Sequence, residues 1–388
     1  MSQGGFELSD DIGVSGVGRI AGFARRLGVG NVMSNLLFSS RFVTIWIAGA
    51  LLLIVCRIIA PNTLSSSSWA ALLPLGSIVA VVALGQMLVI MMGGIDLSMA
   101  ATISLLANVL VGVSEGSDDR LVYAMVIVFA WATVIGLVNG LLVAVLDLNP
   151  LIVTLSTGLI LLGVTSQYRV GTANNSTVPD SLSGFVFERL FGISKTFWLV
   201  LLMALLIALV LRSTAVGRRF QAVGANRRAA WMAGIRVRLY VIAAYVLAAL
   251  AAGLAGILVG GIVVSPGVDP GASYLLGPVA AVVLGGAALS GGLASATSTW
   301  AAAFFVTILN QMLRVLGMAI AWQNVVFGLA IILGMVISGD RIADVVGRLL
   351  LRPGIRNLVG DAEPPGTDDP EPTAGRFPVG HAAAAEHG

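Results

Sequence analysis

The stretch LYVIAAYVLAALAAGLAGILVGGIVV, Leu239 to Val264, carries no charge over 26 residues. It exceeds the roughly 20 residues that a helix needs to cross the hydrocarbon core of a bilayer. It lacks the sustained alternation of apolar and polar residues that marks a membrane β-barrel strand. Of all 388 residues, 57% are hydrophobic and 11% charged, whereas about a quarter are charged in soluble domains. The sequence therefore predicts an all-α, polytopic membrane protein.

Similar apolar runs recur on both sides of this stretch, and they predict about ten transmembrane helices. The predicted spans are Phe42–Ala60, Trp69–Met92, Leu97–Val113, Leu121–Leu146, Leu151–Val164, Phe197–Leu211, Leu239–Val264, Tyr274–Leu289, Thr299–Leu316 and Trp322–Ile337. The polar N-terminal segment is too long before its first apolar run to be a cleaved signal peptide, so the first span is expected to remain as an anchor.

Basic residues concentrate on one side of these spans. The segment before the first span, the loop 212–238 and the segment after the tenth span hold 16 of the 22 arginines and lysines. Because positive charge near span ends favours the cytoplasm, both termini and this loop are predicted to be cytoplasmic. The net charge of +3 then reflects topology, and no aromatic-basic groove indicates nucleic-acid binding.

Three regions follow from the spans and their orientation. Residues 1–41 form a cytoplasmic N-terminal segment, and residues 42–338 form the transmembrane domain with its cytoplasmic loop 212–238. Residues 339–388 form a cytoplasmic tail that becomes rich in Pro, Gly, Asp, Glu and Ala from Pro353 onward. Such a composition buries too little apolar surface to order itself, so a largely disordered tail is predicted.

Few residues in the chain suit catalysis or metal binding. The one cysteine, Cys56, lies inside a predicted span, and both histidines, His381 and His387, lie in the tail. A disulfide, a metal site and histidine-based catalysis are therefore not expected. The one lysine, Lys195, is not part of a Gly-Lys-Ser/Thr step, so the chain has no phosphate-binding P-loop. We expect neither an enzyme activity nor a cofactor in this chain.

The loop before Leu239 reads STAVGRRFQAVGANRRAAWMAGIRVR, Ser213 to Arg238. A cytoplasmic loop collects arginines for topological reasons alone, so its charge indicates nothing further. Asn226 can cap a helix start and Gly234 can end that helix in the left-handed conformation, which predicts a short helix at Arg227–Ala233. Its small apolar face consists of Ala229, Ala230, Met232 and Ala233. An isolated helix this short is marginal in water, so we expect it to pack on its own bundle or on a partner protein.

The segment AVGANRRAAWMAGI, Ala222 to Ile235, resembles the coupling segment of permease subunits from bacterial monosaccharide (ribose-type) ABC importers, which carry A-V-G-x-N-x-x-A-A-x-x-x-G-I. Three further motifs agree with that family in order: GGIDLS at Gly93–Ser98, GLVNGLLVAVLDLNPLIVTLST at Gly136–Thr157, and VAAVVLGGAALSGG at Val279–Gly292. The likeness runs from about Leu72 to Ile337. After the double glycine, where relatives usually continue G-R-G-S-x-x-G-T, this chain has GGLASATSTWAA, so the turn there is expected to pack differently.

The resemblance implies a multi-pass permease of the bacterial plasma (inner) membrane. It implies three protein partners: an ATPase subunit that binds and hydrolyses ATP, an external solute-binding protein, and a second copy of the permease. It also implies that the coupling segment docks on the ATPase through Gly224, Asn226, Ala229, Ala230 and Gly234. The expected cargo is a neutral sugar or polyol. The alternatives are an autoinducer-like sugar, a nucleoside or a branched-chain amino acid, a secondary transporter, and a membrane scaffold that transports nothing.

Polar residues within or beside the spans are candidates for the transport pathway. They are Asp96, Gln86, Asn108, Asn139 and Asn310. A carboxylate embedded in a membrane is costly and usually functional, but Asp96 lies between two spans, where it can also cap the next helix. Amides in a bundle often only bridge helices. The predicted spans have no ionisable residue near their middle, which favours a neutral cargo over a charged one and disfavours ion-coupled transport. The external stretch Thr165–Thr196 is expected to help meet the binding protein.

Overall fold

The computed structural model describes residues 40–332 except 171–176, 264, 320, 327 and 330–331. The chain divides into two compact units, Met1–Gly339 and Asp340–Gly388, and the second lies outside the described residues. The predictions for the N-terminal segment and the tail therefore stay untested. Within the described ranges the fold is helical, apart from one two-stranded antiparallel hairpin.

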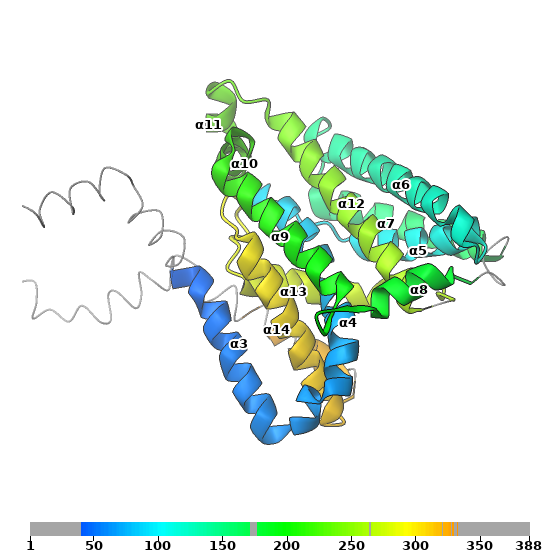
Figure 1. Cartoon of the computed structure of the whole chain (residues 1–388). Coiled ribbons are helices and arrows are strands. Elements are labelled where there is room, and N and C mark those ends of the chain that lie inside the picture. Colours follow the sequence, from blue (N-terminus) through cyan, green and yellow to red (C-terminus); the bar gives the residue numbers. More distant parts are fainter. Residues whose placement is uncertain are drawn as a thin grey trace, which may run out of the picture. The chain divides into compact units, whose positions relative to one another are not determined.

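The first seven predicted spans and the ninth each coincide with a helix (Figure 1). The helices are α3 (Ser40–Ile59), α4 (Ser66–Met91), α5 (Met99–Ser114), α6 (Asp118–Ala144), α7 (Pro150–Tyr168), α8 (Asp180–Phe187), α9 (Lys195–Ser213), α10 (Ala215–Ala225), α11 (Arg227–Met232), α12 (Val237–Ile262), α13 (Leu276–Leu284) and α14 (Ala296–Val315). Five of them, α4, α6, α7, α9 and α12, are long and apolar enough to cross a membrane. The tenth predicted span, Trp322–Ile337, is described only in part.

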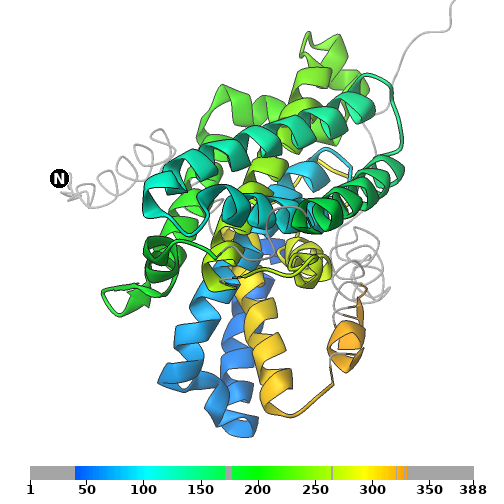
Figure 2. The same cartoon turned by 90° about the vertical axis from the view of Figure 1, so that its right-hand side faces the viewer.

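The helices α4, α5 and α12 form the centre of the bundle. Almost every residue of α5 is buried, and α12 packs against α4, α5 and α6. Small residues permit this closeness: a Cβ on Gly136 of α6 would lie 2.6 Å from the Val246 Cα of α12. Because lipid tails are as apolar as leucine, such close van der Waals contact holds membrane helices together. The helix α14 packs against both α3 and α4 (Figure 2).

Polar side chains cap about half of the described helix starts, including those of α4, α7 and α9. The Asn149 carboxamide accepts a hydrogen bond from the Leu151 N–H (2.9 Å), and Pro150 occupies the first turn of α7. That position tolerates proline because its N–H has no partner within a helix. One proline, Pro74, instead lies inside a helix, buried within α4.

The eighth predicted span, Tyr274–Leu289, is wrong in extent. Its helix, α13, has nine residues and is therefore about 14 Å long, against a hydrocarbon core of about 30 Å. An irregular stretch SPGVDPG, Ser265–Gly271, precedes it, and Gly286 (φ 86°) lies just beyond its end. We call Pro266–Gly271 the broken segment. Apolar composition predicted a full span over Tyr274–Leu289. The prolines and glycines before α13 and the glycine just beyond its end prevent a continuous helix.

Candidate functional site

The loop 212–238, which contains the coupling segment Ala222–Ile235, forms two short helices, α10 and α11, between α9 and α12 (Figure 1). The Asn226 side chain accepts a hydrogen bond from the Ala229 N–H (3.0 Å), so it caps α11 as predicted. Gly234 adopts φ 77° and donates its N–H to the Trp231 carbonyl (2.9 Å). This left-handed residue ends the helix, which confirms the second half of the prediction.

The predicted apolar face of α11 is divided in two. Ala230 is buried (4% exposed), whereas Met232 is 69% exposed and its neighbour Trp231 is 70% exposed. The buried Ala230 thus anchors this six-residue helix, which would be marginal on its own, and leaves an apolar side exposed. Ala229 lies on the exposed side with Met232.

Gly224 lies at the junction of three segments. A Cβ there would overlap the Met91 carbonyl oxygen and lie 2.8 Å from the Gly292 nitrogen. Gly292 donates its N–H to that same carbonyl (2.9 Å). Arg227 donates a hydrogen bond from Nη2 to the next carbonyl, Met92 (2.7 Å). The coupling segment is therefore joined to the end of α4 and to the double-glycine turn after α13.

Asp96 lies in a tight turn between α4 and α5, which we call the Asp96 turn (Gly93–Ser98). Its carboxylate is 4% exposed and accepts hydrogen bonds from the Ser98 N–H (2.9 Å) and the Ser98 hydroxyl (2.6 Å). Gly93 has φ 74°, a conformation that favours glycine. Asp96 was considered for a role in the pathway and for a role at the start of the next helix. The turn geometry supports the second role, because the carboxylate holds the backbone where α5 begins.

Gln86 and Asn139 support the same turn from α4 and α6. With the Gln86 amide oriented to satisfy both of its groups, it bonds the Asp96 N–H and carbonyl, each at 3.1 Å. Asn139 donates to the Ser98 hydroxyl (2.9 Å) and accepts from the Thr157 hydroxyl of α7 (2.7 Å). Three predicted pathway residues, Asp96, Gln86 and Asn139, thus form one buried polar network.

Asn108 belongs to a different cluster, in which α5 holds the broken segment. Its amide donates to the Gly267 carbonyl (3.1 Å), and the Ser104 hydroxyl accepts from the Gly271 N–H (2.9 Å). Ser104 also donates to the Asp269 carboxylate (2.6 Å). Non-helical backbone at membrane depth is stable only where protein groups or water satisfy it. The side chains of α5 do so here.

Arg169, at the end of α7, completes this second cluster. Its guanidinium donates to the Asn108 side-chain oxygen (3.0 Å) and to the Pro266 carbonyl. Sequence reasoning missed both Arg169 and Asp269, because it assigned them to external loops. The signal was present in SPGVDPG, where an aspartate stands between two Pro-Gly steps inside an apolar region.

Asn310, the fifth pathway candidate, lies apart on α14. It is partly buried, and its side-chain oxygen has no hydrogen-bond partner within the described residues. Within the described residues, no hydrogen bond joins its side chain to either cluster. In the same described ranges, no group of three or more His, Cys, Asp or Glu residues could hold a metal ion.

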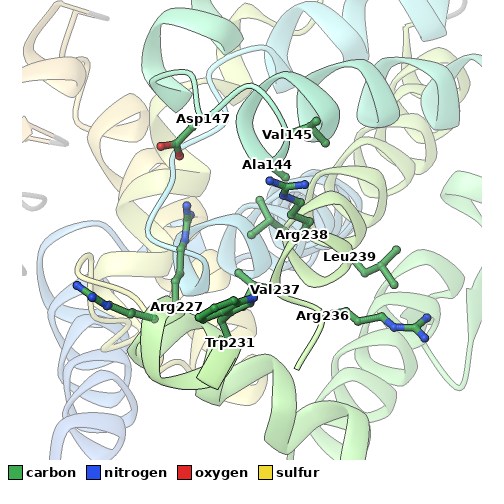
Figure 3. A pocket seen from close by; sticks show the side chains of 11 residues that line it. Ala144, Val145, Asp147, Arg227, Trp231, Arg236, Val237, Arg238 and Leu239 are labelled. Carbon is green, nitrogen blue, oxygen red and sulfur yellow. The ribbon is translucent and has the colours of Figure 1, made fainter. Parts of the chain in front are cut away.

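A pocket of about 780 Å³ opens between α11, the end of α6 and the start of α12 (Figure 3). Its charged lining consists of Arg227, Arg228, Arg236, Arg238 and Asp147. Its apolar lining consists of Ala144, Val145, Trp231, Val237, Leu239 and Val241. Figure 3 shows Arg238 beside Ala144 and Val145, with the Trp231 ring facing this space.

The family model described as "Branched-chain amino acid transport system / permease component" matches residues 68–335. The chain belongs to this permease family. Its relatives include the ribose import permease protein RbsC of Escherichia coli (strain K12), which is 30% identical over 76% of this chain and 92% of its own. RbsC of Bacillus subtilis (strain 168) is 32% identical over 76% and 91%. The autoinducer 2 import system permease protein LsrC of Salmonella typhimurium is 29% identical over 82% and 92%. No solved structure matches.

Family membership confirms the resemblance drawn from the four motifs. The protein is a transport component of the ABC-importer permease family and a multi-pass protein of the plasma membrane. The match begins near Leu72 and ends near Ile337, as the motifs indicated.

Proposed function

We propose that this permease forms the membrane pathway of an importer that carries a neutral sugar or polyol. The observation that carries the proposal is the broken segment, Pro266–Gly271, held against α5 by hydroxyl and amide groups. In transporters, interrupted helices beside a buried polar surface are the usual place where a solute binds. The names of the ribose and autoinducer 2 permeases support the same class of cargo.

The chemistry of the cluster favours a hydroxylated solute. Ser104 and Asn108 offer donors and acceptors that sugar hydroxyls match, and both are fully buried within the bundle. The nearby charges are already engaged, since Arg169 bonds Asn108 and Asp269 bonds Ser104. A neutral solute can exchange hydrogen bonds with such groups without leaving a charge unpaired.

A branched-chain amino acid is the second candidate, and a specific observation favours it. Arg169 bonds the Pro266 carbonyl of the broken segment, and Asp269 belongs to that segment, so these opposite charges together suit a zwitterion. The description of the family model names this cargo.

Uptake by the reconstituted complex separates the two candidates. Radiolabelled ribose, a hexose, a polyol, a nucleoside and leucine would be offered separately, with the binding protein and ATP each present or omitted. We expect accumulation of a sugar or polyol that requires both additions. Accumulation of leucine alone would transfer the assignment to the second candidate, and uptake driven by an ion gradient without ATP would reject the importer mechanism.

We further propose that ATP is hydrolysed by a separate subunit, onto which α11 docks, and that two permease copies form the pathway. A cysteine at Met232 is expected to cross-link to the ATPase, because that side chain is 69% exposed. A cysteine at Ala230, on the same helix but 4% exposed, is the matched control and should not react. Native Cys56 is fully buried, so it need not be removed. Equal cross-linking at both positions would reject this docking geometry.

The external partner is proposed to meet the hairpin before α9. Phe191 stands at its tip with φ 56° and is 89% exposed, and a large apolar side chain this exposed often marks a protein contact. Lys195 pairs with Glu188 (2.6 Å) beside it. A Phe191→Ser variant is expected to weaken binding of the solute-binding protein while leaving ATPase binding unchanged.

A further inference from the structure

The pocket beside α11 combines positive charge with an apolar floor. Its lining includes four arginines and one acidic residue, Asp147. The floor is formed by aliphatic side chains from the last turn of α6 and the first turns of α12, including Val145 and Leu239. Trp231 closes one side (Figure 3). Solvation of the arginines alone would not require aliphatic side chains on the floor of this pocket.

Three of the four arginine side chains have no hydrogen-bond or ion-pair partner within the described residues. Arg227 donates to the Met92 carbonyl, but the guanidinium groups of Arg228, Arg236 and Arg238 make no hydrogen bond or ion pair with any residue in the described part of the chain. Asp147, the one acidic residue of the rim, forms no ion pair with them there either. The rim therefore presents free guanidinium groups, the donors that suit a phosphate best.

The apolar floor continues onto surfaces that face lipid. Val145 is 44% exposed and Leu239 is 54% exposed. Along the same helices Leu141 of α6 and Leu247 of α12 are also exposed, which in a bundle of this kind means contact with acyl chains. The pocket thus lies where the lipid-facing surface meets a basic rim, on the side that the arginine distribution predicts to be cytoplasmic.

We propose that this pocket binds the headgroup of an anionic phospholipid, with its phosphate on Arg236 and Arg238 and its acyl chains along α6 and α12. Basic pockets between helices at the cytoplasmic surface bind such headgroups. Trp231 suits the interface because its ring is both apolar and polar. The bound lipid would join the end of α11 to α6 and α12 and so stiffen the coupling segment.

Charge and shape favour a lipid over other anions. A soluble phosphate would use the arginines but leave Val145 and Leu239 exposed, whereas a phospholipid covers both. An acidic side chain of a partner protein is the other competitor, and it too would leave the aliphatic floor uncovered. The experiment below gives each of these a distinct outcome.

The test uses the full-length permease, purified in detergent and titrated with phosphatidylglycerol or with phosphatidylcholine of the same acyl chains. Bound lipid is counted by native mass spectrometry. We expect tighter retention of phosphatidylglycerol by the wild type. The Arg236→Gln/Arg238→Gln variant should bind it about 30-fold more weakly, since each basic residue near the surface contributes about 1 kcal/mol.

The matched control is Arg218→Gln/Arg219→Gln, which removes the same charge from exposed positions on α10 outside the pocket. It should leave the affinity nearly unchanged. Equal weakening in both variants would show a non-specific charge effect and overturn the proposal. If the pocket variant does not elute as a folded protein, Arg236→Gln and Arg238→Gln are tested singly, each with an expected loss of roughly fivefold.

Two further arms identify the source of the anion. Glycerol 1-phosphate, the soluble headgroup, should not displace the lipid, and displacement at similar concentration would overturn the lipid assignment. If the pocket variant instead keeps its lipid affinity but loses affinity for the ATPase subunit, the pocket takes an acidic side chain and the proposal is wrong.

Discussion

The Asp96 turn and the broken segment are two irregular pieces of backbone that lie against α5, and they are held in different ways. The Asp96 turn is closed by its own carboxylate, which bonds Ser98 two residues away, and is supported by Gln86 and Asn139; Asp96 is 4% exposed. The broken segment is held from far along the chain, because Ser104 and Asn108 bond residues about 160 positions later. Asp269 of that segment is exposed.

The difference indicates which piece moves. A turn whose buried carboxylate belongs to a hydrogen-bonded network opens only at high cost. A partly exposed segment can exchange its hydrogen bonds for water or for a hydroxylated solute, and low-stability elements of this kind supply the moving parts of a protein. We therefore infer that the Asp96 turn is a fixed joint and that the broken segment is the element that opens.

The largest effect is expected at Gly271. A Cβ there would overlap the Ala100 carbonyl and lie 2.7 Å from the Ser104 hydroxyl, so Gly271→Ala should destabilise the fold by about 3 kcal/mol, the upper end for overpacking. Thermal unfolding of the purified permease measures it. Gly277→Ala in α13 is the control, since its Cβ would lie 3.8 Å from Val306. An equal loss of stability in both variants would show that Gly271 is not closely packed against α5.

Asn108→Ala should have the next largest effect. It leaves the Gly267 carbonyl without this donor and removes one acceptor from the Arg169 guanidinium, at a cost of about 2 kcal/mol. Asn139→Ala in the Asp96 network should cost less, about 1 kcal/mol, because the Thr157 hydroxyl it frees can bond its own helix backbone. Hydrogen exchange of Pro266–Gly271 should rise in the first variant alone. Faster exchange in both variants would show that the two clusters are energetically coupled.

Asp96→Ala should cost about 1 to 2 kcal/mol, because the Ser98 N–H loses its buried acceptor. Asp96→Asn keeps an oxygen in that position, so its stability should stay near the wild type. Comparing uptake with unfolding temperature then separates structure from function. If Asp96→Asn is stable but transports nothing, the charge itself acts in the pathway or in coupling.

The smallest effect is expected for Asp269→Asn. The amide oxygen can still accept the Ser104 hydroxyl (2.6 Å), so the unfolding free energy should change by no more than about 0.5 kcal/mol. Uptake of a sugar should be preserved. A loss of leucine uptake in this variant, with sugar uptake absent throughout, would instead support the zwitterion as cargo.

The parts of the fold that sequence predicted are those fixed by local rules. The cap at Asn226 and the stop at Gly234 each depend on a residue and its neighbours within one turn. The length of the apolar runs located the spans, because a segment in lipid must satisfy its own backbone and so forms a helix.

The remaining features depend on contacts that no local rule contains. Gly224 matched the family pattern, but its need for glycine arises from the Met91 carbonyl, which lies more than 130 residues earlier. Which side of α11 is anchored depended on what Ala230 packs against. Likewise, the position of the broken segment depends on the hydrogen-bond partners that α5 offers to Gly267 and Gly271.

Pro74 gives α4 a point at which the helix bends easily. Proline has no N–H for the Ala70 carbonyl, so the hydrogen-bond ladder lacks one rung there and the helix bends most easily at that turn. Beyond it, the buried stretch to Met91 is packed on α12 and α14. The coupling segment contacts the end of this stretch through Gly224 and Arg227. A force on α11 therefore reaches α4 at the end opposite Pro74.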